Sequence, residues 1–378
     1  MAHIIGMADG GGGRTVGLNA IAPCAEHFET YAILGRKGDL PELLRQRGVQ
    51  VFTTGLDHAM RSLFSLPSLV SILRRIKPDV VVNYGQPGGM VGALACRLAG
   101  IKNVLYVTCF PSFYTDWDLF RVIRNHIVER ISCRWATMVG CPSEAARYQY
   151  LLRQLVPSER AVYFPLGVDV KHINPTADKA AIRRELGLPE GVPLVVNVGR
   201  LVDQKRVDWL VRAWALVEAR DEKAVLVIVG DGAERAALEK LAAELKLKRC
   251  RFLGVQPNGS AFFSAADLAV VTTLYEIPGL TVLEAMAAAC PVVVTAADGV
   301  AESVQASNGG GVLVPLADPE ALAKGILTLL QDEQMRSVMG KQGRAYVGKS
   351  CALTDAQLCQ RELIQKVTGN SAEGLGRN

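Results

Sequence analysis

Four charged side chains in the second half of this 378-residue chain suit a ligand that carries both phosphates and hydroxyls. Arg200 and Lys205 follow one apolar run, and Glu276 and Glu284 follow another. A guanidinium and an ammonium that converge on one point can neutralise a diphosphate and stabilise the charge it gains on leaving. Carboxylates accept hydrogen bonds from sugar hydroxyls. Together the four residues fit a nucleotide sugar, although each alone has an ordinary alternative as an exposed surface charge.

The elements predicted around these residues explain how they could meet. The apolar, β-branched run Pro193–Gly199 predicts a buried strand, so Arg200 lies at its carboxyl end, where open α/β sheets bind ligands. Lys205 follows in the loop before a helix predicted from Val207. The run Leu268–Thr273 predicts a second strand at the same sheet edge.

A predicted turn and helix follow the second strand. The helix is expected from Val282 to Cys290, where Pro291 ends it. Free backbone N–H groups and the helix dipole favour phosphate at its start. We expect Glu276, before the turn, to accept hydroxyls of a transferred sugar, and Glu284, on the helix, to accept those of a ribose. The backbone expected to bind phosphate belongs to Gly279, Leu280 and Thr281.

Four motifs in this half carry a family resemblance. They are Gly199-Arg200-Leu-Val-Asp-Gln-Lys205, Val229-Gly-Asp-Gly232, Phe252-Leu-Gly254 and the Glu-x7-Glu of Glu276 to Glu284. In order and spacing they resemble the retaining GT-B glycosyltransferases of family four over about residues 190 to 315. The first half resembles the family in pattern alone.

The resemblance implies a retaining glycosyltransferase that moves a sugar from a UDP- or GDP-sugar to a hydroxyl of a glycan, lipid-linked or small-molecule acceptor. Such a role belongs to polysaccharide or glycolipid biosynthesis and needs no cofactor and no divalent metal. Arg200, Lys205 and Glu276 match the family's catalytic positions. The residues implied in donor binding are Gly199, Gly254, Val255, Gly279, Leu280, Thr281 and Glu284. The chain departs from the family at Ile277 and Pro278, which bears on the choice of donor sugar.

The alternation of strands and helices predicts an α/β fold with two Rossmann-like domains, whose parallel sheets the resemblance places face to face across a cleft. Residues 1–167 are the predicted acceptor-binding domain and residues 168–350 the donor-binding domain. Residues 351–367 are predicted to form a helix that packs back on the first domain, and residues 368–378 a disordered tail.

A glycine-rich segment follows the first predicted strand. We expect it to form a flexible loop before a helix that begins at Val16, and in the resembling family this loop faces the cleft. A dinucleotide fingerprint would need a third glycine that is missing here, which disfavours a nicotinamide-dependent oxidoreductase. The candidate residues of this loop are Gly11, Gly12, Gly13 and Arg14.

The sequence indicates the residues that would bind and deprotonate the acceptor less clearly. Many relatives carry a histidine where this chain has Cys109, so the donor phosphate itself, or Asp116, Asp118 or His126, could accept the acceptor's proton. Asp116-Trp117-Asp118 resembles a metal motif, but it lies in the wrong half for one, so no metal site is predicted. The missing histidine leaves a catalytically silent nucleotide-sugar-binding partner as an alternative.

Composition and charge further restrict the kind of protein and the partners that the sequence predicts. No apolar run approaches the length of a membrane span, and the nine cysteines are odd in number without a CxxC pair, so we expect a soluble cytoplasmic protein with reduced thiols. Residues 1–167 carry 18 Lys and Arg against 12 Asp and Glu, a net charge of +6, against −1 for the remainder. The basic half could contact an acidic acceptor or an anionic membrane surface, or be merely solvated. Nucleic acid is not an expected partner.

Overall fold

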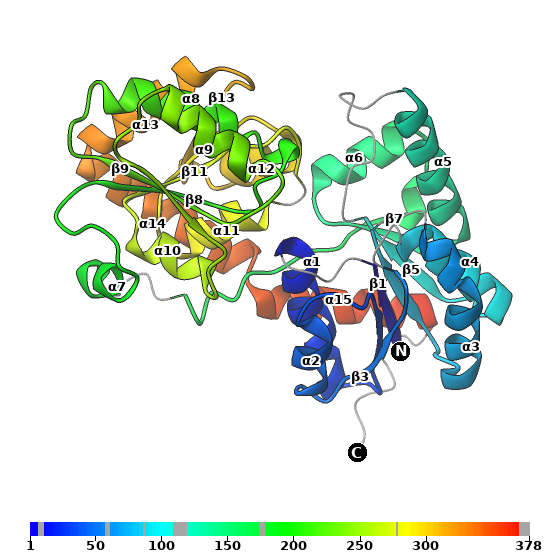
Figure 1. Ribbon diagram of the computed structural model, residues 1–378. Coiled ribbons are helices and arrows are strands. Elements are labelled where there is room, and N and C mark those ends of the chain that lie inside the picture. The colour runs from blue at the N-terminus through cyan, green and yellow to red at the C-terminus, as the bar shows by residue number, and fades with distance from the viewer. Residues whose placement is uncertain are drawn as a thin grey trace. The chain divides into compact units, whose positions relative to one another are not determined.

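The computed structural model describes residues 1–6, 11–56, 61–85, 88–108, 119–173, 178–276 and 279–369. The chain forms two compact units (Figure 1). The first joins Met1–Gly167 to the C-terminal segment that begins at Leu353, and the second is Val168–Ala352. Each unit is built on its own parallel sheet, as the fold prediction requires.

In the first unit, the described residues form a sheet of seven parallel strands in the order β3-β2-β1-β4-β5-β6-β7. Most of its residues are buried, because helices cover both faces and the strands are therefore apolar on both sides. The strands are β1 Ala2–Ile5, β2 Tyr31–Leu34, β3 Gln50–Thr53, β4 Val81–Tyr84, β5 Val104–Val107, β6 Met138–Cys141 and β7 Ala161–Tyr163.

Helices and short turns connect these strands. The α-helices are α1 Gly11–Val16, α2 Leu40–Arg45, α3 Leu66–Ile76, α4 Gly88–Ala99, α5 Leu119–Trp135, α6 Glu144–Leu152 and, from the end of the chain, α15 Leu353–Thr368. The shorter turns are η1 Gly17–Ile21, η2 Ala22–Glu26, η3 Arg61–Ser65 and η4 Ser158–Arg160. The last helix, α15, is anchored in this unit, because the Gln360 side chain donates to the Pro165 carbonyl at 2.6 Å.

The glycine-rich segment differs from the sequence expectation. Gly11, Gly12, Gly13 and Arg14 lie in helix α1 and not in a loop. The prediction followed the low helix propensity of glycine, which tertiary contacts override here. The Arg14 side chain forms an ion pair with Asp39 at 2.9 Å, and the next turn of the helical segment is packed into the core. Arg14 is therefore bound to a carboxylate at the start of α2.

The second unit has a parallel sheet in the order β10-β9-β8-β11-β12-β13. The strands are β8 Leu194–Val198, β9 Val225–Val229, β10 Cys250–Gly254, β11 Leu268–Val271, β12 Val292–Thr295 and β13 Gly311–Val314. Two apolar layers of buried residues cover its faces. The helices are α7 Lys179–Glu185, η5 Asp203–Lys205, α8 Val207–Glu218, α9 Arg235–Glu244, α10 Gly259–Ala265, α11 Leu280–Ala287, α12 Asp298–Ala306, α13 Pro319–Gln331 and α14 Glu333–Ser350.

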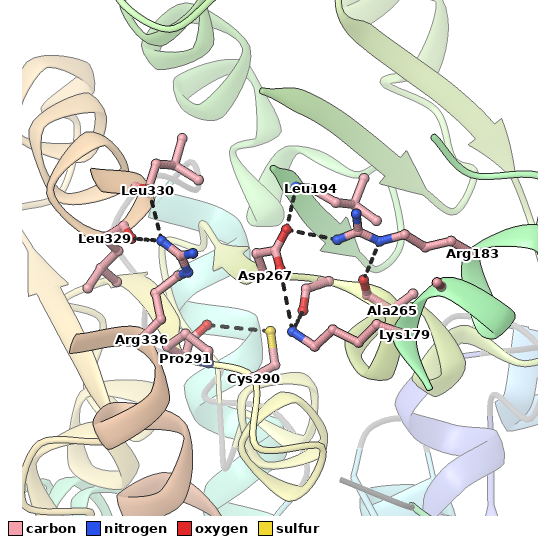
Figure 2. Close-up of polar contacts among 12 residues, drawn as sticks. Lys179, Arg183, Leu194, Ala265, Asp267, Cys290, Pro291, Leu329, Leu330 and Arg336 are labelled. Atoms are coloured by element: carbon pink, nitrogen blue, oxygen red, sulfur yellow. Dashed lines mark hydrogen bonds and ion pairs between the residues drawn. The ribbon is translucent and has the colours of Figure 1, made fainter. Parts of the chain in front are cut away.

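A partly buried carboxylate holds the start of this unit to its sheet (Figure 2). Asp267, just before β11, accepts from the Leu194 backbone N–H and from the Arg183 guanidinium, both at 2.8 Å. Lys179 adds a second cation at 3.5 Å. Burial works to raise the pKa of Asp267, but the Leu194 N–H and the two cations hold it below its usual value. The ionised carboxylate therefore fixes α7 against the amino ends of β8 and β11.

Candidate active site

The carboxyl ends of β8 and β9 lie in close backbone contact. The Gly199 N–H donates to the Val229 carbonyl at 2.9 Å. Gly230 has a φ of +135°, and a Cβ atom there would lie 1.8 Å from the Gly199 carbonyl oxygen. Any other residue at position 230 would displace the turn that leads to Arg200. The Val229-Gly-Asp-Gly232 motif thus provides the backbone against which the turn from Gly199 to Arg200 packs.

Lys205 and Glu276 form an ion pair. The Lys205 Nζ atom lies 2.5 Å from the Glu276 Oε2 atom, and their side chains are 12% and 18% exposed. Lys205 ends the short helix η5 after β8, whereas Glu276 follows β11, so the pair joins the loops of two neighbouring strands. The sequence analysis predicted the two residues at one site, and the structure brings them into contact.

A set of hydrogen bonds holds these two loops together. The Thr272 hydroxyl donates to the Lys205 carbonyl at 2.8 Å, and the Gln204 side-chain amide donates to the Tyr275 carbonyl at 2.8 Å. The Leu274 N–H donates to the Gln204 carbonyl at 2.9 Å. We call Gln204 and Thr272, with these bonds, the loop latch. Sequence reasoning missed it, since a glutamine before a lysine and a threonine after a strand carry no distinctive signal.

Helix α11 begins beside the ion pair. Gly279 caps it with φ +77°, and a Cβ atom at this position would lie 2.4 Å from Val300 Cγ1. The position therefore requires glycine both for its backbone conformation and for its contact with α12. Leu280 and Thr281 form the first positions of the helix, where backbone N–H groups have no carbonyl acceptor within the helix. Such N–H groups could bind an anion, and the anion site expected from the sequence stays a prediction.

Glu284 lies one turn into α11 and is partly buried. Burial, together with the negative charge of nearby Glu276, raises its pKa to about 7. The two carboxylates are therefore close enough to influence each other. Because Lys205 pairs with Glu276, Glu284 is the carboxylate of the site that gains a proton most easily.

The opposite end of the site is formed by β9, β10 and α9. Gly254 ends β10 with φ +71°, and the Val255 side chain that follows is 75% exposed. Arg235 lies beside Gly254 and forms ion pairs with Asp231 at 2.7 Å and Glu239 at 2.8 Å. The exposed Val255 side chain provides an apolar surface on which a flat ring could stack.

Arg200 follows β8 and is exposed. In the part of the chain that the structure describes, it makes no ion pair, in contrast to Lys205. Lys205 is thus already paired with a carboxylate, whereas Arg200 is exposed to solvent and can bind an anion.

Among the residues that the structure describes, the candidates of the first unit do not form a comparable cluster. Cys109, Asp116 and Asp118 lie outside the described residues. His126 lies in α5 and is partly buried. Gly11 to Gly13 and Arg14 belong to α1, as described above. Among the described residues, no three His, Cys, Asp or Glu side chains are grouped so that they could hold a metal ion.

Sequence reasoning also missed a buried polar group in the first unit. Glu129 on α5 is fully buried and accepts hydrogen bonds from the hydroxyls of Tyr106 at 2.9 Å and Tyr150 at 2.8 Å. The eight cysteines that the structure describes are free thiols. No helix among the described residues is long and apolar enough to cross a membrane.

Two family models match consecutive parts of the chain. The model described as "Glycosyltransferase Family 4" matches residues 11–172, and the one described as "Glycosyl transferases group 1" matches residues 178–346. The second match includes the Lys205–Glu276 pair and helix α11. Between them the two models account for most of both units.

Individual glycosyltransferases are also similar to this chain in sequence. The sulfoquinovosyl transferase SQD2 of Arabidopsis thaliana is 30% identical over 75% of this chain and 56% of its own length. A GDP-mannose-dependent monoacylated alpha-(1-6)-phosphatidylinositol monomannoside mannosyltransferase of Corynebacterium glutamicum is 33% identical over 49% of this chain and 51% of its own. The chain thus spans about half the length of the curated relatives it matches.

Solved structures show the same fold over nearly the whole chain. The structure of Anabaena HepE in complex with UDP-glucose has a TM-score of 0.82 at 22% identity and covers 97% of this chain and 99% of that one. Sucrose-phosphate synthase from Thermosynechococcus elongatus has a TM-score of 0.83 at 23% identity and covers 98% and 99%. The fold is therefore that of the GT-B glycosyltransferases, and with the two family models it shows that this chain belongs to the group 1 glycosyltransferases of family 4.

Proposed function

We propose that the protein is a retaining glycosyltransferase that transfers a sugar from a UDP- or GDP-sugar to a hydroxyl of a glycan, lipid-linked or small-molecule acceptor. The observation that carries the proposal is the Lys205–Glu276 ion pair at the start of α11, with Glu284 one turn further on. A cation, a helix N-terminus and two carboxylates side by side match the parts of a nucleotide sugar.

The comparisons support the donor class. Solved relatives include HepE in complex with UDP and with UDP-glucose, and one curated relative is named as dependent on GDP-mannose. The names of other relatives refer to a lipopolysaccharide core and to inositol 3-phosphate. These acceptors differ, so we propose the donor class and leave the acceptor as a hydroxyl compound.

Each residue has a role that follows from its position. The N–H groups of Leu280 and Thr281, with Lys205 and Arg200, bind the diphosphate. Glu284 accepts the ribose hydroxyls. Glu276 accepts hydroxyls of the donor sugar, and on donor binding Lys205 exchanges part of its contact with this carboxylate for the phosphate oxygens.

The transfer needs no side-chain base. The bond between the anomeric carbon and the phosphate oxygen breaks, and the acceptor oxygen bonds to the same face of that carbon. The acceptor's proton passes to the departing diphosphate, whose growing negative charge is stabilised by Lys205, Arg200 and the helix N-terminus. Since these groups supply the positive charge, we propose that no divalent metal is required.

The experiment is a donor screen on the purified full chain. UDP- and GDP-sugars are incubated with and without EDTA, release of nucleoside diphosphate is measured, and the anomeric configuration of the product is determined by NMR. We expect one nucleotide class to be consumed with retention and without loss in EDTA. An inverted product would contradict the retaining mechanism. Donor binding without turnover across acceptors would instead favour a silent nucleotide-sugar-binding partner.

A further inference from the structure

Helix α5 exposes an apolar stripe to solvent. Phe120 is 74% exposed, Ile123 50% and Ile127 51%. Their spacing of three and four residues places them on one face of the helix. Large apolar side chains grouped in this way are uncommon on the surface of a soluble protein and indicate an interaction site.

Three arginines lie on the same face. Arg130 and Arg134 are exposed, and Arg124 is partly exposed. A rotation of about 100° per residue places these arginines and the three apolar side chains within an arc of about 120°. We call these six residues the α5 face.

The single carboxylate of the helix is kept away from this face. Glu129 lies on the opposite side and is fully buried against the hydroxyls of Tyr106 and Tyr150. Asn125 and Cys133 are buried on the same side as Glu129. These contacts fix the rotation of α5 about its axis, so the α5 face has three positive charges and no negative one.

We propose that the α5 face binds the surface of an anionic lipid bilayer. Interfacial helices combine apolar side chains that enter the headgroup boundary with arginines that meet lipid phosphates, and this face offers both. The net charge of +6 over residues 1–167 adds long-range attraction.

Charge argues against a second copy of the chain as the occupant. In a symmetric dimer through this face, the arginines of one copy would meet those of the other with no carboxylate on the face to neutralise them. A polyanion without an apolar layer would leave Phe120, Ile123 and Ile127 unused. The bilayer surface is the partner that accounts for both kinds of side chain.

The test is co-sedimentation of the full chain with vesicles, without any donor, so it does not depend on the proposed transfer. Vesicles of phosphatidylcholine alone are compared with vesicles that also contain phosphatidylglycerol. We expect binding to the anionic vesicles to be more than about tenfold stronger. Failure of the wild-type chain to bind anionic vesicles would overturn the proposal and leave the transferase function unaffected.

Two variants and a control examine the face itself. Arg130→Glu with Arg134→Glu should lower binding by more than about tenfold. Phe120→Ser with Ile123→Ser should lower it by at least about tenfold. The control replaces two exposed cations of the second unit, Arg212→Glu with Arg220→Glu, for the same change in net charge, and it should bind like the wild type.

Each alternative has its own result. Equal loss in the control would show that net charge alone drives binding. Full binding by the apolar variant would indicate a general polyanion site, and a change of oligomeric state in either variant would indicate a self-interface. Any of these would overturn the proposal. Circular dichroism and melting temperature verify that the variants, all at solvent-exposed positions, remain folded.

Discussion

The two units have the same architecture but place their ionisable groups differently. In the second unit, charged residues stand at the carboxyl ends of adjacent strands and meet there, as Lys205 and Glu276 do. In the first unit, the Glu129 side chain of α5 is buried, His3 is buried beside Tyr84, and Arg130 and Arg134 of α5 are exposed. The arrangement suits a small ligand in one unit and a larger surface in the other.

Burial in the first unit also suppresses the chemistry of its titratable groups. Burial lowers the pKa of His3 to about 3, so its ring is neutral at physiological pH. Burial raises the pKa of Cys96 and Cys141 to about 12, which keeps both thiols protonated. By contrast, the pKa of Glu284 in the second unit, at about 7, allows both protonation states. Among the described residues, Glu284 in the second unit is thus a group whose pKa is shifted to near neutral pH.

The largest effect is expected from removal of the paired cation. Lys205→Ala removes the ammonium that stabilises the leaving diphosphate, so transfer should fall by about 100- to 1,000-fold. Lys240→Ala, which breaks the exposed Lys240–Glu244 pair on α9 of the same unit, should change transfer less than twofold. Initial rates with saturating donor provide the comparison. Equal rates for the two variants would show that the cation at 205 is not part of the reaction.

A second prediction separates binding from transfer. Glu276→Gln removes the charge that holds Lys205, so the free ammonium should bind nucleoside diphosphate about three- to tenfold more tightly. Transfer should nevertheless fall by about 100-fold, because the donor sugar loses its carboxylate. Calorimetric titration and rate measurements on the same preparation report both quantities. Weaker diphosphate binding would mean that the ion pair does not compete with the ligand.

The approach of Lys205 to Glu276 could be predicted from the sequence, because it depends on apolar runs and turn glycines that lie close to these two residues in the chain. Strand β8, Leu194–Val198, lies within the apolar run Pro193–Gly199 that predicted it. Gly230 and Gly279 occupy backbone conformations that favour glycine, so their motifs could be recognised. Turn residues at the carboxyl ends of parallel strands necessarily meet at one edge.

Helix α1 and the loop latch depend on contacts between segments that are distant in the sequence, so neither could be predicted from local sequence patterns. The glycines from Gly11 to Gly13 favour a loop by propensity, yet the Arg14–Asp39 pair and core packing accompany a helix there. The loop latch joins Gln204 to a carbonyl 71 positions away. The exposed side of α5 could not be predicted either, because the helix carries apolar side chains on several sides: Val122 and Val128 are partly buried, whereas Ile123 and Ile127 are exposed.

A third prediction concerns the loop latch. Gln204→Ala and Thr272→Val each remove one hydrogen bond between the two loops, so the turnover number should fall by about tenfold while donor KM changes little. Thr328→Val removes a similar hydroxyl-to-carbonyl bond from α13 and should leave turnover unchanged. Gln204→Glu cannot donate to the Tyr275 carbonyl and should resemble Gln204→Ala. Full activity in Gln204→Ala would show that the latch does not position Lys205.

The smallest effect is the pH dependence of donor binding. Because the pKa of Glu284 is about 7, the ionised carboxylate that accepts the ribose hydroxyls rises about tenfold in fraction from pH 6 to pH 8. Donor affinity should rise by up to the same factor, and Glu284→Gln should remove the dependence while weakening binding at pH 8.

Ionisation of Glu284 should have the opposite effect on the stability of the fold, which falls as the pH rises. A carboxyl whose pKa is raised by folding contributes stability at low pH that is lost as the pH rises through about 7. The ligand-free Glu284→Gln variant should therefore melt a few degrees above the wild type at pH 8, with the difference disappearing near pH 5. An unchanged melting difference across this range would contradict the raised pKa.

In the proposed function, the second unit binds the diphosphate of a nucleotide sugar through Lys205 and the start of α11. The direct measurement is the melting temperature of the purified chain with UDP, GDP, ADP or NADH at matched concentration, with and without EDTA, for the wild type and Lys205→Ala. At 100 times its dissociation constant, the preferred ligand should stabilise by about 2.7 kcal/mol, a rise of roughly 5–10 °C. Such a rise is expected for UDP or GDP in the wild type, unaffected by EDTA, and it should be lost in Lys205→Ala. An equal rise in both proteins, or a rise with NADH alone, would contradict it.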